Sequence, residues 1–394
     1  MAIEVTKVTD QAALREFCEL PLRLHPPSHY VPVPERRIRA WYEGTGPQRR
    51  YGPVDLYLAR DCGGRVVGRT CLHRNSALDA RVGRQVQLFG LTEFADARSD
   101  PALVVDGADP AKELLDLAEQ AGIVSGCDLL LGPVELLPDQ SPGVLVPSTE
   151  EGQGFGERGF SGGGWSPPYY PAAYERLGFT RRWPGRTWIC EGLDDPGRLC
   201  PEKAFVVDEQ RMRDEEIQVH RGSRRSLRRV LPALRHILNA SAAQVEQRTE
   251  VSHADFAERA AGLSRVLDER LPLYLTRAGE PVAFLLAVPD VSPFLMATRG
   301  RPSQRQRLAL RAAAWRGDHP DEAALVASGT LPQWQGRGYL TLLARELYRA
   351  LGEAGYRTLR GYRVPEGDRA AEAPYRGMGG RPLHRTAFYE RRLR

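Results

Sequence analysis

The segment whose residues most clearly indicate a chemical function is a glycine-rich turn in the last third of the chain, Leu331-Pro332-Gln333-Trp334-Gln335-Gly336-Arg337-Gly338-Tyr339-Leu340. It follows an apolar run at residues 324–327 and precedes a long amphipathic pattern. A strand that enters such a turn at the start of a helix presents several unpaired backbone N–H groups to one point. Together with the helix dipole these groups form an anion site suited to a pyrophosphate, to which Arg337 would add positive charge.

Two amphipathic helices with similar surroundings are expected in the chain. One covers residues 338–354, with Leu340, Leu343, Leu347 and Leu351 on one face and Gly355 after it. The other covers residues 110–121, with Asp109 as N-cap and Gly122 after it. A turn that leads into a strand precedes each helix, at residues 64–68 and 279–283. A short strand follows each helix, at residues 129–131 and 358–360, and an aromatic turn comes later, at residues 174–179 and 375–380.

This approximate internal repeat predicts a tandem arrangement of α/β (α+β) class. Each domain would be a mixed, twisted sheet flanked by helices. We expect an N-terminal domain over residues 1–204 and a C-terminal domain over residues 205–394, whose first strand begins near residues 216–219. The first half holds an extra glycine-rich and aromatic stretch at residues 139–168, which is predicted to be a loop.

Composition narrows the class of protein. A chain of 394 residues with 42% apolar and 27% charged residues suits two soluble globular domains. The longest apolar run, residues 281–288, is too short to span a membrane, and the N-terminus lacks a secretion signal, so a cytoplasmic location is expected. The six cysteines show no metal-ligand spacing, so no metal is expected. Nearly all basic residues are arginines, which reflects either coding bias or phosphate binding by guanidinium groups.

The glycine-rich turn resembles the pyrophosphate loop of the GNAT N-acyltransferase superfamily, Gln/Arg-x-x-Gly-x-Gly/Ala. Residues 335–340 match this pattern with Leu340 in the last small position, and residues 333–338 match in a second register. Residues 375–380 resemble the family's tyrosine ahead of a Gly-Phe pair, with Gly380 in place of Phe and Asp368 where asparagine is frequent. Nearly the whole chain is similar to bacterial tandem-GNAT proteins, through residues 15–21, 129–133, 169–179 and 379–393.

The resemblance implies an N-acyltransferase that forms an amide by moving an acyl group from acyl-CoA to a small-molecule amine. The implied donor-binding residues are Leu331, Gln335, Gly336, Arg337, Gly338, Tyr339 and Leu340. A backbone N–H near Leu331 would polarise the acyl carbonyl, and Tyr375 would protonate the leaving thiolate. The base is not identified by the sequence: Glu322, Asp290 and Glu366 are candidates, and a water-mediated base or an already neutral amine would need none of them.

The first half keeps Tyr174 and a Gly178-Phe179 pair, but residues 106–109 (Asp-Gly-Ala-Asp) stand where the loop would be. Because their carboxylates would repel a pyrophosphate, this half is interpreted as degenerate for the cofactor and as a contributor to the acceptor site.

Two other functions stay open from the sequence. An aminoacyl-tRNA could be the donor in natural-product or peptide-type biosynthesis, with an arginine track as phosphate contacts: Arg221, Arg224, Arg225, Arg228 and Arg229. The same residues would equally form a solvated helix face, and no aromatic residues interleave them, so a DNA partner is not expected. The third possibility is a non-catalytic acyl-ligand sensor or scaffold.

Overall fold

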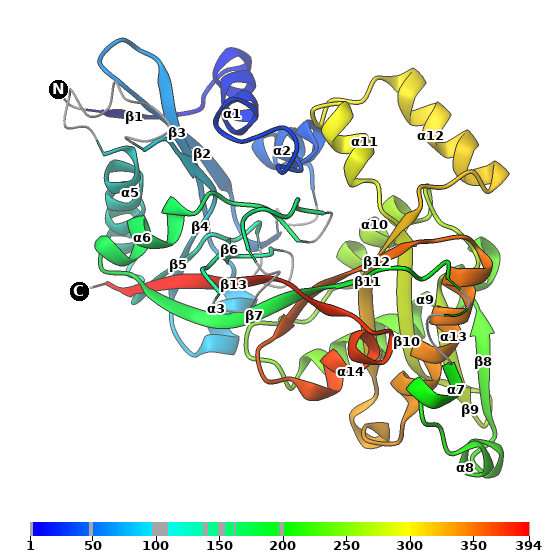
Figure 1. Ribbon diagram of the computed structural model, residues 1–394. Coiled ribbons are helices and arrows are strands. Elements are labelled where there is room, and N and C mark those ends of the chain that lie inside the picture. The colour runs from blue at the N-terminus through cyan, green and yellow to red at the C-terminus, as the bar shows by residue number, and fades with distance from the viewer. Residues whose placement is uncertain are drawn as a thin grey trace. The chain divides into compact units, whose positions relative to one another are not determined.

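The computed structural model describes residues 3–46, 50–96, 109–136, 141–148, 154–160, 163–195, 197 and 201–393, without the side chains of Glu202, Arg224 and Arg228. The chain divides into two compact units (Figure 1). Unit 1 comprises Met1–Pro184, Ser292–Arg301 and His384–Arg394, and unit 2 comprises Gly185–Val291 and Pro302–Leu383. Each unit is described separately below.

Unit 1 contains a mixed sheet in which an antiparallel meander is followed by one parallel strand. The meander consists of β1 (Glu4–Lys7), β2 (Val54–Arg60), β3 (Val66–His73) and β4 (Val86–Phe94). Strand β5 (Leu129–Gly132) runs parallel to β4, and β13 (Arg381–Arg392) runs antiparallel to β5 and also pairs with β6 (Val144–Leu145). The helices are α1 (Gln11–Leu24), α2 (Glu35–Tyr42), α3 (Ser76–Val82), α5 (Pro110–Val124), α6 (Tyr169–Arg176) and α11 (Ser292–Ala297).

Helices cover both faces of the unit 1 sheet, because residues along its strands alternate between two hydrophobic clusters. Leu56 and Leu58 of β2 pack in the cluster that contains Phe17 of α1 and Trp41 of α2. Tyr57 and Ala59, one position along, pack in the cluster of α5 and α6 residues, which includes Leu114, Ala118, Tyr170 and Tyr174. The unit is therefore a three-layer α/β/α arrangement.

Unit 2 repeats this strand order. Its meander consists of β8 (Ile217–Arg221), β9 (Leu273–Arg277), β10 (Glu280–Pro289) and β11 (Glu322–Thr330). Strand β12 (Thr358–Pro365) runs parallel to β11, and β7 (Thr180–Cys190) pairs antiparallel with β12. The helices are α7 (Pro201–Ala204), α8 (Glu209–Asp214), α9 (Arg224–Ala242), α10 (His253–Leu263), α12 (Gln304–Arg316), α13 (Tyr339–Glu353) and α14 (Arg369–Gly377), with a 3₁₀ turn, η3 (Pro332–Trp334).

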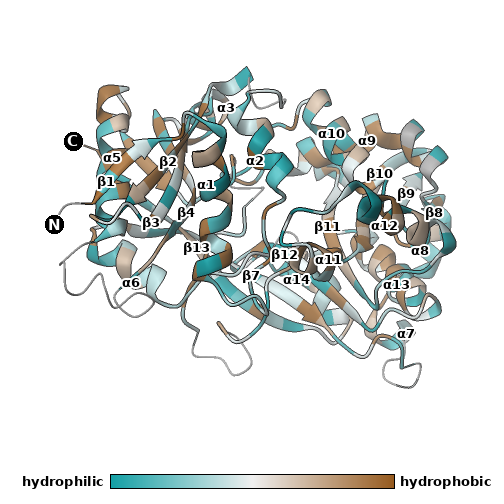
Figure 2. Cartoon of the chain, turned by 90° about the horizontal axis from the view of Figure 1, so that it is seen from above, coloured by the Kyte–Doolittle hydropathy of each residue, from teal (hydrophilic) through white to brown (hydrophobic). Residues whose placement is uncertain are grey.

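The predicted repeat and fold class are confirmed, since both units place a helix between two parallel strands: α5 between β4 and β5, and α13 between β11 and β12. Asp109 caps α5 by accepting a hydrogen bond from the Lys112 N–H at 3.2 Å. The predicted end of this helix at Gly122 is wrong, because that glycine is buried against Leu393 and the helix continues to Val124. Figure 2 shows α1 and α5 carrying both hydrophilic and hydrophobic residues, while β10 and β11 are largely hydrophobic.

The closing strand of each sheet comes from the opposite half of the sequence. In unit 1, residues 389–392 of β13 pair with residues 129–132 of β5. In unit 2, residues 185–190 of β7 pair with residues 359–365 of β12. The compact units therefore do not coincide with the predicted ranges 1–204 and 205–394. Strands pair through backbone groups that all residues share, so the local sequence does not indicate which distant strand will close each sheet.

Within the described ranges, no helix has the length and apolarity needed to cross a membrane.

Phe388 of β13 tests the exchange of strands. Its side chain is fully buried in unit 1 among Leu88, Leu129, Leu131 and Val134. Phe388→Ala leaves a cavity that we expect to cost about 3–5 kcal/mol. Hydrogen exchange should accelerate in β4 and β5, whereas Arg392→Ala, at the exposed end of the same strand, should leave it unchanged. Acceleration confined to residues 205–394 would contradict the exchanged arrangement.

Candidate functional site

A fork between two parallel strands defines the candidate site in unit 2. Strands β11 and β12 pair only over residues 322–325 and 358–361, and each then continues separately, to Thr330 and to Pro365. The pairing of β11 with β10 is irregular at the same level, where Leu286 faces Ala327 but Ala287 faces Leu325, so that Val326 is an extra residue. Ligands of open α/β sheets bind outside the carboxyl ends of parallel strands, which is where this fork opens.

The glycine-rich turn joins β11 to α13 at the open end of this fork. Gly336 and Gly338 both have left-handed backbones, with φ of +73° and +79°, which favour glycine at these positions. Gly338 is the N-cap of α13 and provides no side-chain cap, and the first helical hydrogen bond runs from the Leu342 N–H to the Gly338 carbonyl at 2.9 Å. In the described chain, the backbone N–H groups of residues 336–341 have no recorded acceptor. The sequence analysis assigns Gly336, Arg337, Gly338, Tyr339 and Leu340 of this stretch to donor binding.

Two predicted details of the turn need correction. The Leu331 N–H donates to the Val282 carbonyl at 3.0 Å, because β11 is still paired with β10 there, so this amide is not available to polarise an acyl carbonyl. Arg337 does not extend freely toward an anion, because its Nη1 pairs with the Glu215 carboxylate at 2.7 Å. Leu340 is half-buried and packs against the hydrophobic core.

Glu215, which lies between α8 and β8, binds side chains of the glycine-rich turn. Its carboxylate accepts a short hydrogen bond from the Tyr339 hydroxyl and pairs with Arg211 at 3.0 Å and Arg337 at 2.7 Å, while Arg277 lies 3.8 Å away. The Tyr339 hydrogen bond and the arginine contacts lower the pKa of Glu215 from 4.5 to about 2, against the opposing effect of burial. Three guanidinium groups around one carboxylate leave net positive charge beside the amide cluster.

Tyr375 lies at the base of the fork. Its ring stacks on Trp188 of β7, with centroids 5.7 Å apart and planes 9° from parallel. The same ring covers Gly361, the last β12 residue paired with β11, and a Cβ at Gly361 would overlap it. The side chain is buried, and burial raises the pKa of Tyr375 well above its usual value, so the phenol stays protonated.

The structure explains two departures from the family pattern around Tyr375. Asp368 is the N-cap of α14 and accepts a hydrogen bond from the Ala371 N–H at 3.0 Å, a role that asparagine performs equally well. Gly380 follows this helix where its Cβ would overlap the Cys190 sulfur and the Tyr375 carbonyl, so the close packing of β7 excludes a larger residue.

A cavity of about 600 Å³ opens beside the first turn of α13. It is bounded by α7, by the start of α13 at Thr341 and by one side of α14, and its charged lining residues are Arg186, Arg369 and Arg376 with Glu366 and Glu372. Its volume lies within the usual range for cofactor sites. The sequence analysis missed Arg186, Arg369 and Arg376, since no spacing links them to the turn.

Of the three carboxylates considered as a base, only Glu366 lines this cavity, where it pairs with Arg186 at 3.0 Å. Glu322 pairs with Arg360 at 2.7 Å, and Asp290 is buried with its N–H bonded to the Glu322 carbonyl.

The predicted arginine track is wrong at Arg221. That residue ends β8 and pairs with Glu353 at 3.3 Å, because the helix begins only after Ser223, which caps α9. Arg225 and Arg229 are exposed on α9, whereas the side chains of Arg224 and Arg228 lie outside the described part of the chain.

The corresponding fork in unit 1 is narrower. Strands β4 and β5 pair over residues 86–88 and 129–131, and the Val134 N–H then donates to the Phe89 carbonyl at 2.8 Å. The Val134 carbonyl occupies the position where Gly90 would carry a Cβ. Asp109 caps α5 and pairs with Arg176 at 2.7 Å, while residues 106–108 lie outside the described residues.

Unit 1 contains instead a buried polar cluster that the sequence analysis missed. Glu93 accepts hydrogen bonds from His25 at 2.6 Å and from the Tyr170 hydroxyl at 2.7 Å. Burial opposes its ionisation, but His25, Arg69 and Tyr170 together lower the pKa of Glu93. The residues of this polar cluster come from β3, β4, α6 and the position directly after α1, so no local sequence motif indicates them.

No group of His, Cys, Asp and Glu side chains within the described ranges could hold a metal ion, and the described cysteines carry thiols rather than disulfides.

A mixed sheet with a helix between two parallel strands is the core arrangement of the GNAT fold, and this chain contains it twice; the two strands are splayed open in unit 2. Comparison with solved structures supports this fold assignment. A tandem GNAT protein from the clavulanic acid biosynthesis pathway matches over 100% of this chain and 99% of its own, with TM-score 0.55 and 14% identity. A GCN5-related N-acetyltransferase from Sphaerobacter thermophilus matches over 100% and 96%, with TM-score 0.51 and 12% identity.

A third structure contains a glucosamine N-acetyltransferase region of a fungal multi-domain β-N-acetylglucosaminidase; it matches over 99% of this chain and 38% of its own, with TM-score 0.55 and 14% identity. No family model and no curated protein matches the sequence. The chain therefore has the fold of tandem GNAT proteins.

The low pKa of Glu215 generates a pH prediction. A carboxylate whose pKa falls from 4.5 to about 2 on folding stabilises the folded state above pH 4.5 and loses that contribution as the pH falls toward 2. Glu215→Gln should lower the free energy of unfolding at pH 7 by roughly 1–2 kcal/mol. This is less than the full pKa shift would give, because solvent partly screens the ion pairs. In urea titrations this difference should shrink between pH 5 and pH 2. The exposed Glu353→Gln is the control, and an equal pH dependence in both variants would contradict the role given to Glu215.

Proposed function

We propose that the protein is an N-acyltransferase that uses acyl-CoA as donor and the amine of a small molecule as acceptor. The observation that carries the proposal is the cluster of backbone N–H groups at residues 336–341, which lack a recorded acceptor among the described residues and adjoin a cavity of about 600 Å³. Such amides at a helix N-terminus bind the oxygens of a diphosphate.

The donor would lie across the open fork. Its diphosphate would contact the amides of Gly336, Gly338 and the first turn of α13, with the net positive charge around Glu215 nearby. The acyl carbonyl would then reach the unpaired edge of β11 beyond Leu325, whose N–H groups replace the Leu331 amide as candidate donors to the developing oxyanion.

Tyr375 would act as the general acid. The phenol is protonated in neutral solution and would pass its proton to the departing thiolate when the amine attacks; burial, which raises the pKa of Tyr375, opposes this transfer, so the proposal rests on the position of the ring at the fork. Glu366, which lines the cavity and pairs with Arg186, would accept a proton from the amine. Unit 1, whose fork is occupied by the Val134 segment, would not bind the donor. A cytoplasmic location remains part of this proposal.

An aminoacyl-tRNA donor receives less support. Of the five arginines proposed as phosphate contacts, Arg221 is engaged by Glu353 and lies outside the helix. The sensor alternative shares the donor site and differs only in lacking turnover, so activity measurements separate it from catalysis.

Binding of CoA tests the donor site. Gly336→Asp adds a carboxylate to the turn, and we expect affinity for CoA, measured by calorimetry, to fall at least tenfold because this charge opposes the diphosphate. Gly355→Asp is a matched control: both glycines are left-handed, with φ of +73° and +79°, and neither has an atom within 4 Å of an added Cβ. Equal CoA affinity in both variants, or no CoA binding by the wild type, would refute the proposed donor. Binding of charged tRNA that weakens steeply with salt would favour the RNA alternative.

Turnover tests Tyr375. Tyr375→Phe keeps the stack on Trp188 but removes the proton, so kcat for acetyl-CoA with a mixed amine pool should fall by about 10²–10⁴-fold while the KM for the donor changes little. Tyr174→Phe removes the hydroxyl from the equivalent buried tyrosine of unit 1 and should leave kcat unchanged. Similar loss in both variants would indicate a structural effect and contradict the assignment.

A further inference from the structure

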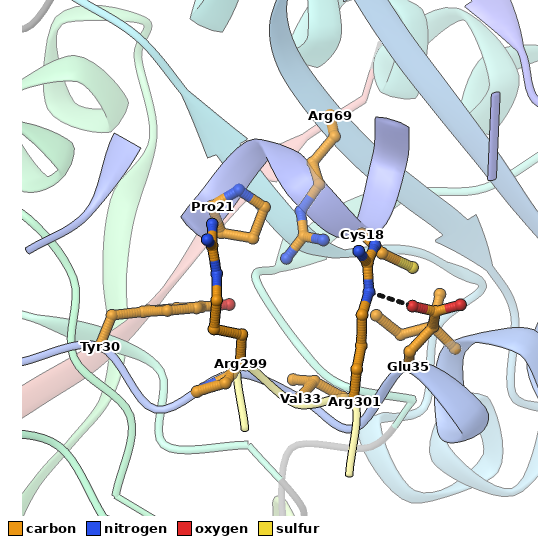
Figure 3. Close-up of a pocket in the computed structure, with 10 residues that line it drawn as sticks. Cys18, Pro21, Tyr30, Val33, Glu35, Arg69, Arg299 and Arg301 are labelled. Atoms are coloured by element: carbon orange, nitrogen blue, oxygen red, sulfur yellow. Dashed lines mark ion pairs between the residues drawn. The ribbon is translucent and has the colours of Figure 1, made fainter. Parts of the chain in front are cut away.

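Three arginines of unit 1 converge on one small hollow, shown in Figure 3. Arg69 comes from β3, and Arg299 and Arg301 come from the segment that follows α11. The figure shows their guanidinium groups directed into the same space, beside Tyr30 and Cys18. We call this site the arginine hollow; its remaining lining consists of Pro21, Pro32, Val33, Glu35 and Ile38.

Arg69 is a buried cation without full compensation. Its residue is only 1% exposed, its Nη1 donates to the Phe17 carbonyl at 2.7 Å, and its Nε has no hydrogen-bond partner. The nearest carboxylate, Glu93, is 3.8 Å away and is already engaged by His25 and Tyr170.

The turn that carries the other two arginines is held in place. The Glu35 N–H donates to the Gly300 carbonyl at 3.1 Å, and a Cβ at Gly300 would lie 3.2 Å from Pro32 and from the Val33 carbonyl. Arg299 itself has a left-handed backbone with φ of +50°, which is uncommon for a residue with a side chain. This strained turn therefore fixes the backbone positions of Arg299 and Arg301.

Charge in the hollow is unbalanced. Arg301 is neutralised by Glu35 and by Glu19 at 2.9 Å, whereas Arg299 makes no ion pair within the described part of the chain. The lining thus contains three guanidinium groups and one carboxylate. Burial raises the pKa of Tyr30, so its phenol is a neutral hydrogen-bond donor, and burial raises the pKa of Cys18 to about 11, so its thiol adds no negative charge.

Size selects the class of anion. The free space is about 10 Å³, room for roughly one water molecule, and Arg299 is exposed at its edge, where its side chain can move aside. A planar carboxylate with two oxygens matches guanidinium forks and is smaller than a tetrahedral phosphate. The walls of proline, valine and isoleucine side chains suit the apolar carbon that bears the carboxylate.

We propose that the arginine hollow binds the carboxylate group of a small ligand, with Arg69 at its base and Arg299 closing over it. This site lies in unit 1 and is separate from the donor site of unit 2, so it stands whether or not the chain transfers acyl groups.

The test uses acetate as probe, with sodium chloride adjusting every sample to one ionic strength. Acetate should raise the melting temperature of the wild type saturably, and the concentration dependence gives an apparent Kd. Arg299→Ala should weaken this Kd at least tenfold. Arg299→Gly should do the same while relieving the strained φ, which separates loss of binding from loss of stability. Arg305→Ala, an exposed arginine of α12 outside the hollow, should bind acetate like the wild type.

Three outcomes would overturn the proposal. The first is the absence of a saturable shift in the wild type beyond that of chloride, and the second is a shift that persists in both Arg299 variants. Inorganic phosphate could also stabilise the wild type as strongly as acetate does, which would exclude the size-based choice of a carboxylate. Because CoA binding is measured on other variants, failure here and failure of the donor site are distinguishable.

Discussion

The site depends on the early end of pairing between the parallel strands β11 and β12. Beyond Leu325 and Gly361 each strand has backbone groups on the facing edge that the partner strand no longer satisfies, and buried groups of this kind require another partner. The amides at the start of α13 meet the same opening because the helix connects these two strands. Gly361 lets the Tyr375 ring cover the base of the fork. The groups proposed for donor binding, oxyanion contact and general acid catalysis are thus all associated with one local separation of strands.

Unit 1 shows how the same topology can lose that opening. There the chain after β5 stays beside β4, with the Val134 N–H bonded to the Phe89 carbonyl and the Val134 carbonyl against Gly90. The edge groups that a ligand would satisfy are satisfied by the protein. Unit 1 contains instead a set of buried charged side chains around Glu93 and Arg69. The two units therefore share a fold while offering different chemistry, which is expected when function depends on the site rather than on the fold.

Sequence patterns predicted the features that arise from neighbouring residues. Asp109 caps α5, Gly355 follows directly after the end of α13 in a left-handed conformation, and α13 begins directly after the glycine-rich turn. Contacts between distant residues could not be predicted in this way. Glu215 meets Arg337 across more than a hundred positions, and β13 closes the sheet of unit 1 from the far end of the sequence. Arg221 was misplaced because the helical spacing of the arginines continues across Gly222 into β8, where strand pairing with Leu273 decides the structure.

The abundance of arginine, ambiguous in the sequence, acquires a physical interpretation from its partners. Around the turn and the cavity, arginines are held by carboxylates: Arg337 by Glu215, Arg186 by Glu366 and Arg376 by Glu372. Such pairs weaken the attraction for an incoming anion but fix the guanidinium groups before it arrives, which reduces the entropy lost on binding. Arg69 differs, since it is buried with a distant and shared carboxylate. Preorganisation by paired carboxylates suits a large anion that contacts many groups, whereas an undercompensated buried cation suits a small one that supplies the missing charge itself.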